Sequence, residues 1–328
     1  MLLALGPHAS QDPVLLYKML RICRTGLGIR DTGARYEADT AGGEVVAADT
    51  DSALYYLTLT LMDEVFLPSL SLLTSNCCLA EEIWSVLRHF PYEQVCYYHL
   101  YDYIIYNRSI VLQRYRLYDQ WKGDTISAHP VLLRYKATVL KAIKKLMQRV
   151  SKENVKPTGR QLGKLSHSSP GLIFTYILSQ IQVYDNLIGP VVDSLKYLTN
   201  LSFDVLGYCI IEALNDPNRV RTKTDGTSIS MWLTALSSFC GAVFKKHTIE
   251  LTGLLQYVAN QLKAKHSLDL LIIKEIVTKM GGIEAAEEMT VEQLEASAGG
   301  ELLRQEAASF TQVSFTQNQI SHNHHFSR

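Results

Sequence analysis

The stretch "GPVVDSLKYL", residues 189–198, places a proline inside one of the most apolar parts of the chain. A proline in the middle of a helix costs about 3 kcal/mol, because it lacks an N–H donor and clashes with the preceding turn. As the first residue of a helix it costs almost nothing, since the N–H at that position has no partner within the helix. We therefore predict that Gly189 ends one segment and that Pro190 begins the next helix.

Helical spacing of apolar residues continues on both sides of this stretch. Ser169 is a candidate N-cap for a helix that begins with Pro170, and Ser202 is a candidate N-cap for a later one. A period near 3.6 residues then recurs until Gly281 and Gly282 stop it. Helices are predicted over residues 170–181, 190–198, 203–214, 229–244, 251–262 and 271–280.

The upstream part of the chain is helical in character but less regular. Pro68 is expected to bend or divide an apolar segment, and residues 132–150 form an amphipathic pattern whose inward stripe includes Leu133. Two stretches lack helical periodicity. They are the glycine-rich residues 26–51, a predicted flexible loop, and the tyrosine-rich residues 95–113. Helices are predicted over residues 12–24, 54–73, 79–90 and 132–150.

No segment requires a strand, so the predicted fold class is all-α. Successive helices can bury their apolar faces by pairing into hairpins of roughly 30 to 47 residues that stack on one another, as in an α-solenoid. Such hairpins are predicted to begin near Pro170, Phe203 and Glu250. The expected divisions are an upstream helical region, a basic linker, a helical-repeat domain and a disordered tail, over residues 1–150, 151–169, 170–310 and 311–328.

The composition of the 328-residue chain excludes a global electrostatic attraction to nucleic acid or to anionic membranes. Lys plus Arg and Asp plus Glu number 32 each, so the formal net charge is zero. The six cysteines form no C-x-x-C pair, which favours a reducing compartment. No basic leader and no uncharged apolar run of about 18 residues is present, so we expect a soluble intracellular protein with no membrane contact.

Motifs for catalysis and for cofactor binding are absent from the sequence. There is no G-x-S-x-G elbow and no G-x-x-x-x-G-K-[ST] loop, and Gly26, Gly28 and Gly33 do not have the spacing of a dinucleotide loop. The residues closest to a metal-ligand pattern are Cys77, Cys78, His89, Cys96, His99, His322, His324 and His325. They lack the two ligand pairs that zinc requires. We predict no enzyme, no cofactor, no metal and no small-molecule substrate.

One segment is strongly basic. Residues 134–164 contain ten cationic side chains and one acidic residue, Glu153, which gives a local charge of +9. Such a segment can bind the phosphates of RNA, can bind an acidic protein partner, or can be a solvated helix face. The candidate contact residues are Arg134, Lys136, Lys141, Lys144, Lys145, Arg149, Lys152, Lys156, Arg160 and Lys164.

Tyrosine is concentrated in one short part of the chain. Eight of the eighteen tyrosines lie between Tyr92 and Tyr118. Aromatic rings on a basic surface can stack on single-stranded bases, but few basic residues precede Arg108 in this block. We favour packing or interface roles for these tyrosines.

Longer strings in the chain resemble a known family. They include "KENVKPTGRQLGKLSHSSPG", "YILSQIQVYDNLIGPVVDSLKYL", "SSFCGAVFKK", "LLQYVANQLKA" and "MTVEQLEASAGGE", with "LPSLSL", "RYRLYDQW" and "HPVLLRYKA" further upstream. The chain resembles the THO complex subunit 2 family over most of residues 7–312. Two departures are the insertion "VCYYHLYDYIIYNRSIVLQ" and an end soon after "AGGE", which is typical of a fragment or a short isoform.

The resemblance implies a nuclear, all-helical and non-catalytic scaffold that organises the other THO subunits for messenger RNA packaging and export. The part that begins near Ser169 resembles the helical-repeat middle domain of translation-initiation scaffolds, which implies a DEAD-box RNA helicase as a partner and only indirect contact with messenger RNA. The alternative function is a direct RNA-binding module centred on residues 134–164.

Overall fold

The computed structural model describes residues 2–29, 53–90, 113–121, 129–216, 219–223 and 228–282. Helices joined by short turns make up most of these ranges, and their one strand-like feature is an isolated antiparallel bridge between Thr222 and Ile229. The predicted all-α class is confirmed for them. Met1–Ile276 forms one compact unit and Val277–Arg328 forms a second. Most of the predicted glycine-rich loop, residues 95–112 of the tyrosine-rich stretch and the chain after Gly282 lie outside the described residues.

The upstream helices follow local start signals in the sequence. Asp12 is the N-cap of α2, and its carboxylate accepts hydrogen bonds from the backbone N–H groups of Val14 and Leu15, each at 3.1 Å. The backbone stays helical from Ala53 to Leu72, so Pro68 does not divide its apolar segment. The irregularity there is a π-helical turn, Met62–Phe66, directly before α4, in which Pro68 is the second residue. The helices are α1 Leu2–Leu5, α2 Pro13–Gly26, α3 Ala53–Leu61, α4 Leu67–Leu72, α5 Cys77–Leu87 and α6 Gln113–Tyr118.

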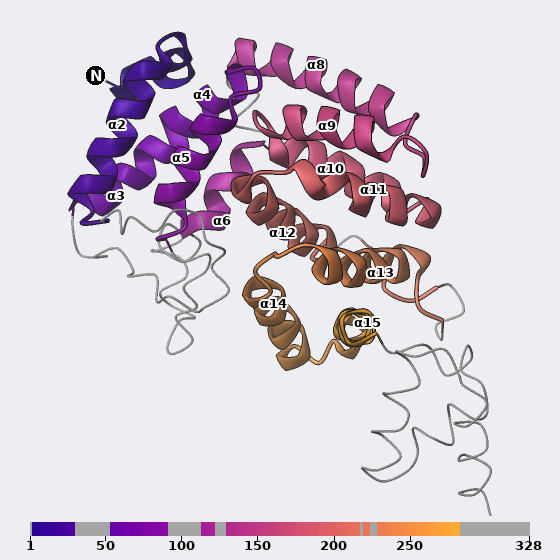
Figure 1. Ribbon diagram of the computed structural model, residues 1–328. Helices are drawn as coiled ribbons and strands as arrows, with labels where there is room; N and C mark the ends of the chain where they lie inside the picture. The colour runs from indigo at the N-terminus through magenta and orange to yellow at the C-terminus, as the bar shows by residue number, and fades with distance from the viewer. Residues whose placement is uncertain are drawn as a thin grey trace, which may run out of the picture. The chain divides into compact units, whose positions relative to one another are not determined.

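The remaining helices of the first unit pack in two layers. Helices α8, α10, α12 and α14 lie side by side in one layer, and α9, α11 and α13 lie side by side in the other (Figure 1). Their bounds are α8 Pro130–Met147, α9 Val155–Ser166, α10 Pro170–Ile181, α11 Ile188–Ser194, α12 Asn200–Leu214, α13 Met231–Lys246, α14 Thr252–Lys263 and α15 Leu270–Gly281. Of the predicted hairpins, the one near Phe203 corresponds to α12 and α13, which pack against each other. Helices α10 and α11 are joined by the 3-10 turn Asp185–Leu187, which contacts both, and the start predicted near Glu250 lies just before α14.

The predicted linker over residues 151–169 is wrong for most of its length, because α9 occupies it and packs against α8, α10 and α11. Gly159 and Gly163 lie one turn apart on the face of α9 toward Ser194 and Tyr197. A Cβ atom at Gly159 would lie 2.7 Å from the Ser194 carbonyl oxygen, and one at Gly163 would lie 2.8 Å from that of Tyr197. The two glycines therefore permit a close helix contact.

Three details of the predicted helices also differ. Helix α11 begins at Ile188, so Pro190 is its third residue and not its first. Backbone N–H groups in the first turn of a helix have no partner within that helix, so the proline still costs no hydrogen bond there. The N-cap of α12 is Thr199, whose hydroxyl accepts a hydrogen bond from the N–H of Ser202 at 3.3 Å. Leu133 is 49% exposed and lies off the buried stripe of α8, because Leu132, Val139 and Ile143 define the inward face.

A buried ion pair joins α6 to the helical layers. The Arg114 guanidinium lies 2.9 Å from the Asp204 carboxylate on α12 and 3.3 Å from the Glu250 carboxylate, and it stacks over the Trp84 ring of α5 at 5.3 Å. Tyr118 donates a 2.5 Å hydrogen bond to Asp204. Burial raises the pKa of the Asp204 carboxyl, and Arg114 and Tyr118 counteract part of that rise.

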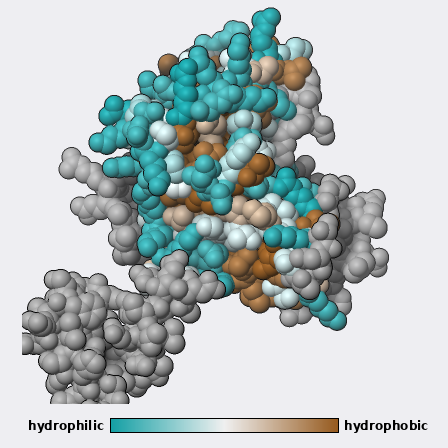
Figure 2. All heavy atoms as spheres, turned by 90° about the vertical axis from the view of Figure 1, so that its right-hand side faces the viewer, coloured by the Kyte–Doolittle hydropathy of each residue, from teal (hydrophilic) through white to brown (hydrophobic). Residues whose placement is uncertain are grey.

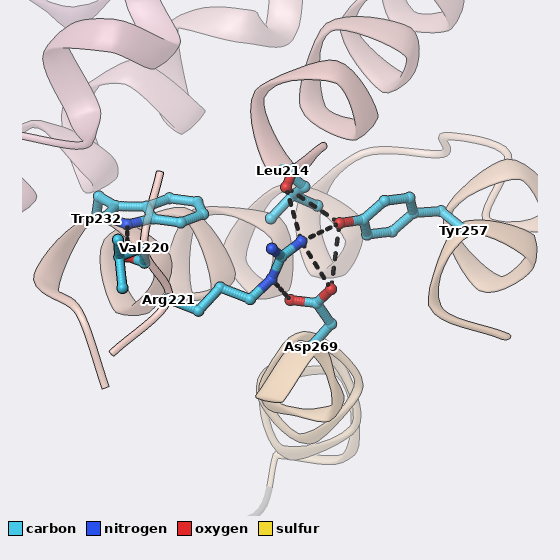
Figure 3. A network of polar contacts seen from close by, with 6 residues as sticks. All are labelled: Leu214, Val220, Arg221, Trp232, Tyr257 and Asp269. Carbon is cyan, nitrogen blue, oxygen red and sulfur yellow. Dashed lines mark hydrogen bonds and ion pairs between the residues drawn. The ribbon is translucent and has the colours of Figure 1, made fainter. Parts of the chain in front are cut away.

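A second polar network contacts the C-terminal end of α12 (Figure 3). Arg221 donates to Asp269 from Nε at 2.9 Å and to the Leu214 carbonyl from Nη2 at 3.3 Å. The Tyr257 hydroxyl lies 3.1 Å from the same carbonyl and 3.2 Å from Asp269. Burial raises the pKa of Tyr257 to about 12, so the hydroxyl stays protonated at neutral pH. The network supplies donors to a carbonyl that the last turn of a helix leaves without a partner.

We predict opposite effects for two glycine-to-alanine substitutions. Gly163→Ala should destabilise the chain by about 1–3 kcal/mol, because the new methyl group meets the backbone of Tyr197 and the crowding outweighs the gain in helix propensity. Gly207→Ala, within α12, should stabilise it by about 0.5–1 kcal/mol, because the atoms nearest to the new Cβ lie at ordinary contact distances of 3.9 Å and 4.0 Å. Urea unfolding followed by circular dichroism measures both. Equal changes in the free energy of unfolding for the two variants would contradict a close contact at Gly163.

Loss of Arg114 should be costly and dependent on pH. We expect Arg114→Met to lower the free energy of unfolding by about 3–5 kcal/mol at pH 7, because Asp204 then remains buried without its cation. The folded-state pKa of Asp204 is raised above its unfolded value, so its carboxylate destabilises the fold as the pH rises through that folded-state value. The substitution raises the folded-state pKa of Asp204 further, so this carboxyl is more fully protonated at pH 4.5. The free energy of unfolding lost on substitution should therefore be smaller at pH 4.5 than at pH 7.

The double variant Arg114→Met/Asp204→Leu is the matched control, since it removes both charges. It should recover most of the stability that the single variant loses at pH 7. Urea unfolding at both pH values, with each variant compared with the wild type, measures this. A single variant as stable as the double variant at pH 7 would show that the ion pair does not hold α6.

Candidate binding surface

The ten predicted cationic residues lie on α8, on α9 and in the turn that joins these two packed helices. Nine of them are exposed, and Lys136 is half-buried. We call the nine exposed residues the basic surface. They are Arg134, Lys141, Lys144, Lys145, Arg149, Lys152, Lys156, Arg160 and Lys164.

The helical period explains why these side chains point to solvent. On α9, Lys156, Arg160 and Lys164 follow one another at four-residue intervals, on the side opposite the buried Leu162. On α8, Arg134, Lys141 and Lys145 share the side opposite the buried residues of that helix. Figure 2 shows hydrophilic residues over the part of the molecule at the level of α8 and α9.

The basic surface carries charge that the fold does not neutralise. Among the described residues, no Asp or Glu lies within ion-pair distance of any of the nine. Like charges four residues apart on a helix destabilise it by about 0.2–0.5 kcal/mol per pair. An anionic partner would remove this repulsion, so the arrangement is suited to binding an anion over an open surface.

The described residues hold no group of three or more His, Cys, Asp or Glu side chains that could bind a metal ion. Cys77 and Cys78 are exposed, while Cys96, His99 and the histidines of the tail lie outside the described residues. A cavity beside Trp121 and Leu172 has about 10 Å³, which is room for about one water molecule. Each helix in the described ranges is too short or too polar to cross a bilayer.

The sequence did not predict an open groove of about 310 Å³ at the C-terminal ends of α8 and α10. Its lining residues are Met147, Gln148, Tyr176, Gln180, Tyr184, Asn186 and Leu187. Tyr176 of α10 is only partly buried, so its ring is available to the groove. The signal was the string "QVYDNL", residues 182–187, in which apolar side chains follow the end of a helix and remain exposed.

These features define a class of protein: an all-α chain of packed helical hairpins that offers open, charged surfaces to partners. Comparison with known proteins gives the family. Residues 1–160 match the family described as "THO complex subunit 2 N-terminus", and residues 162–237 match the family "Transcription- and export-related complex subunit". The chain belongs to the THO complex subunit 2 family, which confirms the resemblance that the sequence indicated.

Relatives across eukaryotes agree with this assignment. The chain is similar to THO complex subunit 2 of Homo sapiens, with 52% identity over 309 residues, and to that of Arabidopsis thaliana, with 34% identity over 320 residues. Similarity to THO complex subunit 2 of Saccharomyces cerevisiae is 24% over 304 residues. These alignments cover 94%, 94% and 92% of this chain but only 18%, 16% and 17% of the relatives. The chain therefore spans less than a fifth of their length.

The basic surface should dominate binding of the chain to a polyanion. We expect the fourfold variant Lys141→Glu, Lys144→Glu, Lys145→Glu and Arg149→Glu to elute from heparin at a much lower salt concentration than the wild type, because neutralised contacts release fewer counterions. The control variant reverses three lysines and one arginine elsewhere, at Lys18, Arg88, Lys245 and Lys274, which are also exposed. Elution of the two variants at the same salt concentration would show that the net charge of the chain, and not the position of the cations, determines binding to heparin.

Proposed function

We propose that this chain is a non-catalytic scaffold segment of the THO complex that acts in the nucleus. It holds other THO subunits, and the DEAD-box RNA helicase of the export pathway, on the outer faces of its helices during packaging and export of messenger RNA. The observation that carries the proposal is the alignment of 94% of the chain with THO complex subunit 2 of Homo sapiens at 52% identity.

We propose that the chain works by holding its partners at fixed positions relative to one another. Two layers of helices provide long surfaces, and partners contact such surfaces through many modest interactions. A scaffold must also keep those surfaces at fixed separations. The Arg114–Asp204 pair and the Arg221 network support this role, because each joins segments that are far apart in the sequence. Messenger RNA would then be bound mainly by the partners.

The basic surface is proposed to contact an acidic protein partner. The absence of ion pairs to its nine cations within the described residues supports this proposal, and it equally supports the alternative, direct binding of RNA. The two alternatives differ in salt dependence and in the partner that is lost when the surface is reversed.

Binding to individually purified THO subunits and to the helicase tests the scaffold proposal. We expect the full chain to capture at least one THO subunit and the control variant, with reversals at Lys18, Arg88, Lys245 and Lys274, to retain it. Reversal of Lys141, Lys144, Lys145 and Arg149 should weaken capture of an acidic subunit by at least tenfold. If no subunit and no helicase binds, the scaffold proposal is wrong.

Titration of a fluorescent single-stranded RNA at several salt concentrations tests the alternative. The scaffold proposal expects weak RNA binding that the fourfold reversal changes little in the presence of partner subunits. Tight binding with a steep salt slope, abolished by the reversal while subunit capture persists, would favour the RNA-binding module.

A further inference from the structure

The groove at the ends of α8 and α10 combines apolar and polar lining. Met147 and Leu187 supply aliphatic surface, and Tyr176 and Tyr184 supply aromatic rings. Amide groups of Gln148, Gln180 and Asn186 also line it, so donors and acceptors are available beside the apolar surface. At about 310 Å³ the groove can accept one large apolar side chain with part of its backbone.

Cations lie on one flank of this groove. Lys144 precedes Gln148 by one helical turn on the same side of α8, and Arg149 and Lys152 follow in the turn before α9. These three side chains belong to the basic surface and are exposed. On the other flank Asp185 is exposed between Tyr184 and Asn186. The groove therefore has a strongly cationic side and a single anionic position.

Exposed apolar residues continue from the groove along the same edge of the molecule. Val183 and Tyr184 are 68% and 54% exposed, and Val220 and Met231 are 71% and 68% exposed. Contacts of Arg219 connect the two pairs, since it donates to Gln182 and lies over the Trp232 ring at 5.7 Å. In Figure 2, which faces this edge, brown patches lie below the hydrophilic upper part. Exposed apolar residues that gather in one region are typical of contact sites.

We propose that this groove binds an acidic segment of a partner protein that carries at least one large apolar side chain. The apolar side chain enters between Tyr176, Tyr184 and Leu187, and the carboxylates of the segment face Lys144, Arg149 and Lys152. Amide groups of the lining hydrogen-bond to the backbone of the segment. The inference rests on the proposed scaffold function and adds to it a specific site and the chemistry of the partner.

The lining favours a peptide over a nucleic acid strand. A strand that followed the groove would bring its phosphates past Asp185, which repels them, and would find cations on one side only. A peptide can place its acidic residues on the cationic side and an apolar residue in the groove. The aliphatic lining residues Met147 and Leu187 also suit apolar side chains better than bases.

Photo-crosslinking in the assembled complex tests the site. The change Val183→p-benzoylphenylalanine places the probe beside the groove, and Val14→p-benzoylphenylalanine, at an exposed position on α2, is the matched control. The full chain is assembled with purified THO subunits and RNA, and crosslinked peptides are identified by mass spectrometry. We expect the Val183 probe, and not the Val14 probe, to crosslink to one subunit segment with a net negative charge and a large apolar residue.

Other outcomes are decisive in different ways. Crosslinks from Val183 to RNA, to a basic segment or to no partner in a complex that still assembles would overturn the groove proposal and leave the scaffold function standing. Failure to assemble with any subunit would overturn both.

Binding of a synthetic peptide of the crosslinked sequence, followed by fluorescence anisotropy, supplies a second measurement. Tyr184→Ala and Lys144→Glu/Arg149→Glu should each weaken binding at least tenfold, whereas Lys18→Glu/Arg88→Glu should change it less than twofold. The loss from the Lys144 and Arg149 reversals should diminish as the salt concentration rises from 50 to about 500 mM, and the loss from Tyr184→Ala should not. Unchanged affinity in Tyr184→Ala would contradict insertion into the groove.

Discussion

Arg114 and Asp204 meet 2.9 Å apart in surroundings where neither charge could be buried alone. Helix α6, with six residues, is too short to be stable by itself, so its position depends on the contacts of Arg114 and Tyr118. Through those contacts Trp84 of α5, Asp204 of α12 and Glu250, two residues before α14, all lie against the Arg114 guanidinium. The upstream helices and the two helical layers consequently form one compact unit over Met1–Ile276.

The basic surface depends on a different kind of contact. Helix α9 carries three of the nine cations and only a few large apolar residues, so its attachment to the layers relies on how closely its backbone approaches Ser194 and Tyr197 at the two glycines. Close packing of this kind gains dispersion contacts that compensate for mutual repulsion among the lysines and arginines. The charge is thereby held on rigid helices, where it can present a fixed pattern to a partner.

The pattern of apolar residues was sufficient to predict the all-α class and most helices, because burial of one face imposes the 3.6-residue period on α8, α10, α12 and α13. The same reasoning missed α9, since glycine and proline usually signal a break in a helix and the sequence does not show which neighbour approaches a glycine. Thr199 was missed in favour of Ser202 because both can cap, and only the fold shows which one is followed by helical backbone. The cationic residues could be found from composition alone, but the groove beside them could not, since it arises where the ends of α8 and α10 meet.

The wide turn at Met62–Phe66 has a consequence for length variation in this family. One π-helical turn holds one residue more than an α-helical turn. The run from Val65 to Ser71, which includes the point at Leu67 where the α-helix resumes, is buried. A relative that lacks one residue here could replace the wide turn with an ordinary one and keep both flanking helices in place. Alignment gaps of a single residue are therefore structurally permissible at this position, whereas within α3 or α5 they would rotate every following side chain by about 100°.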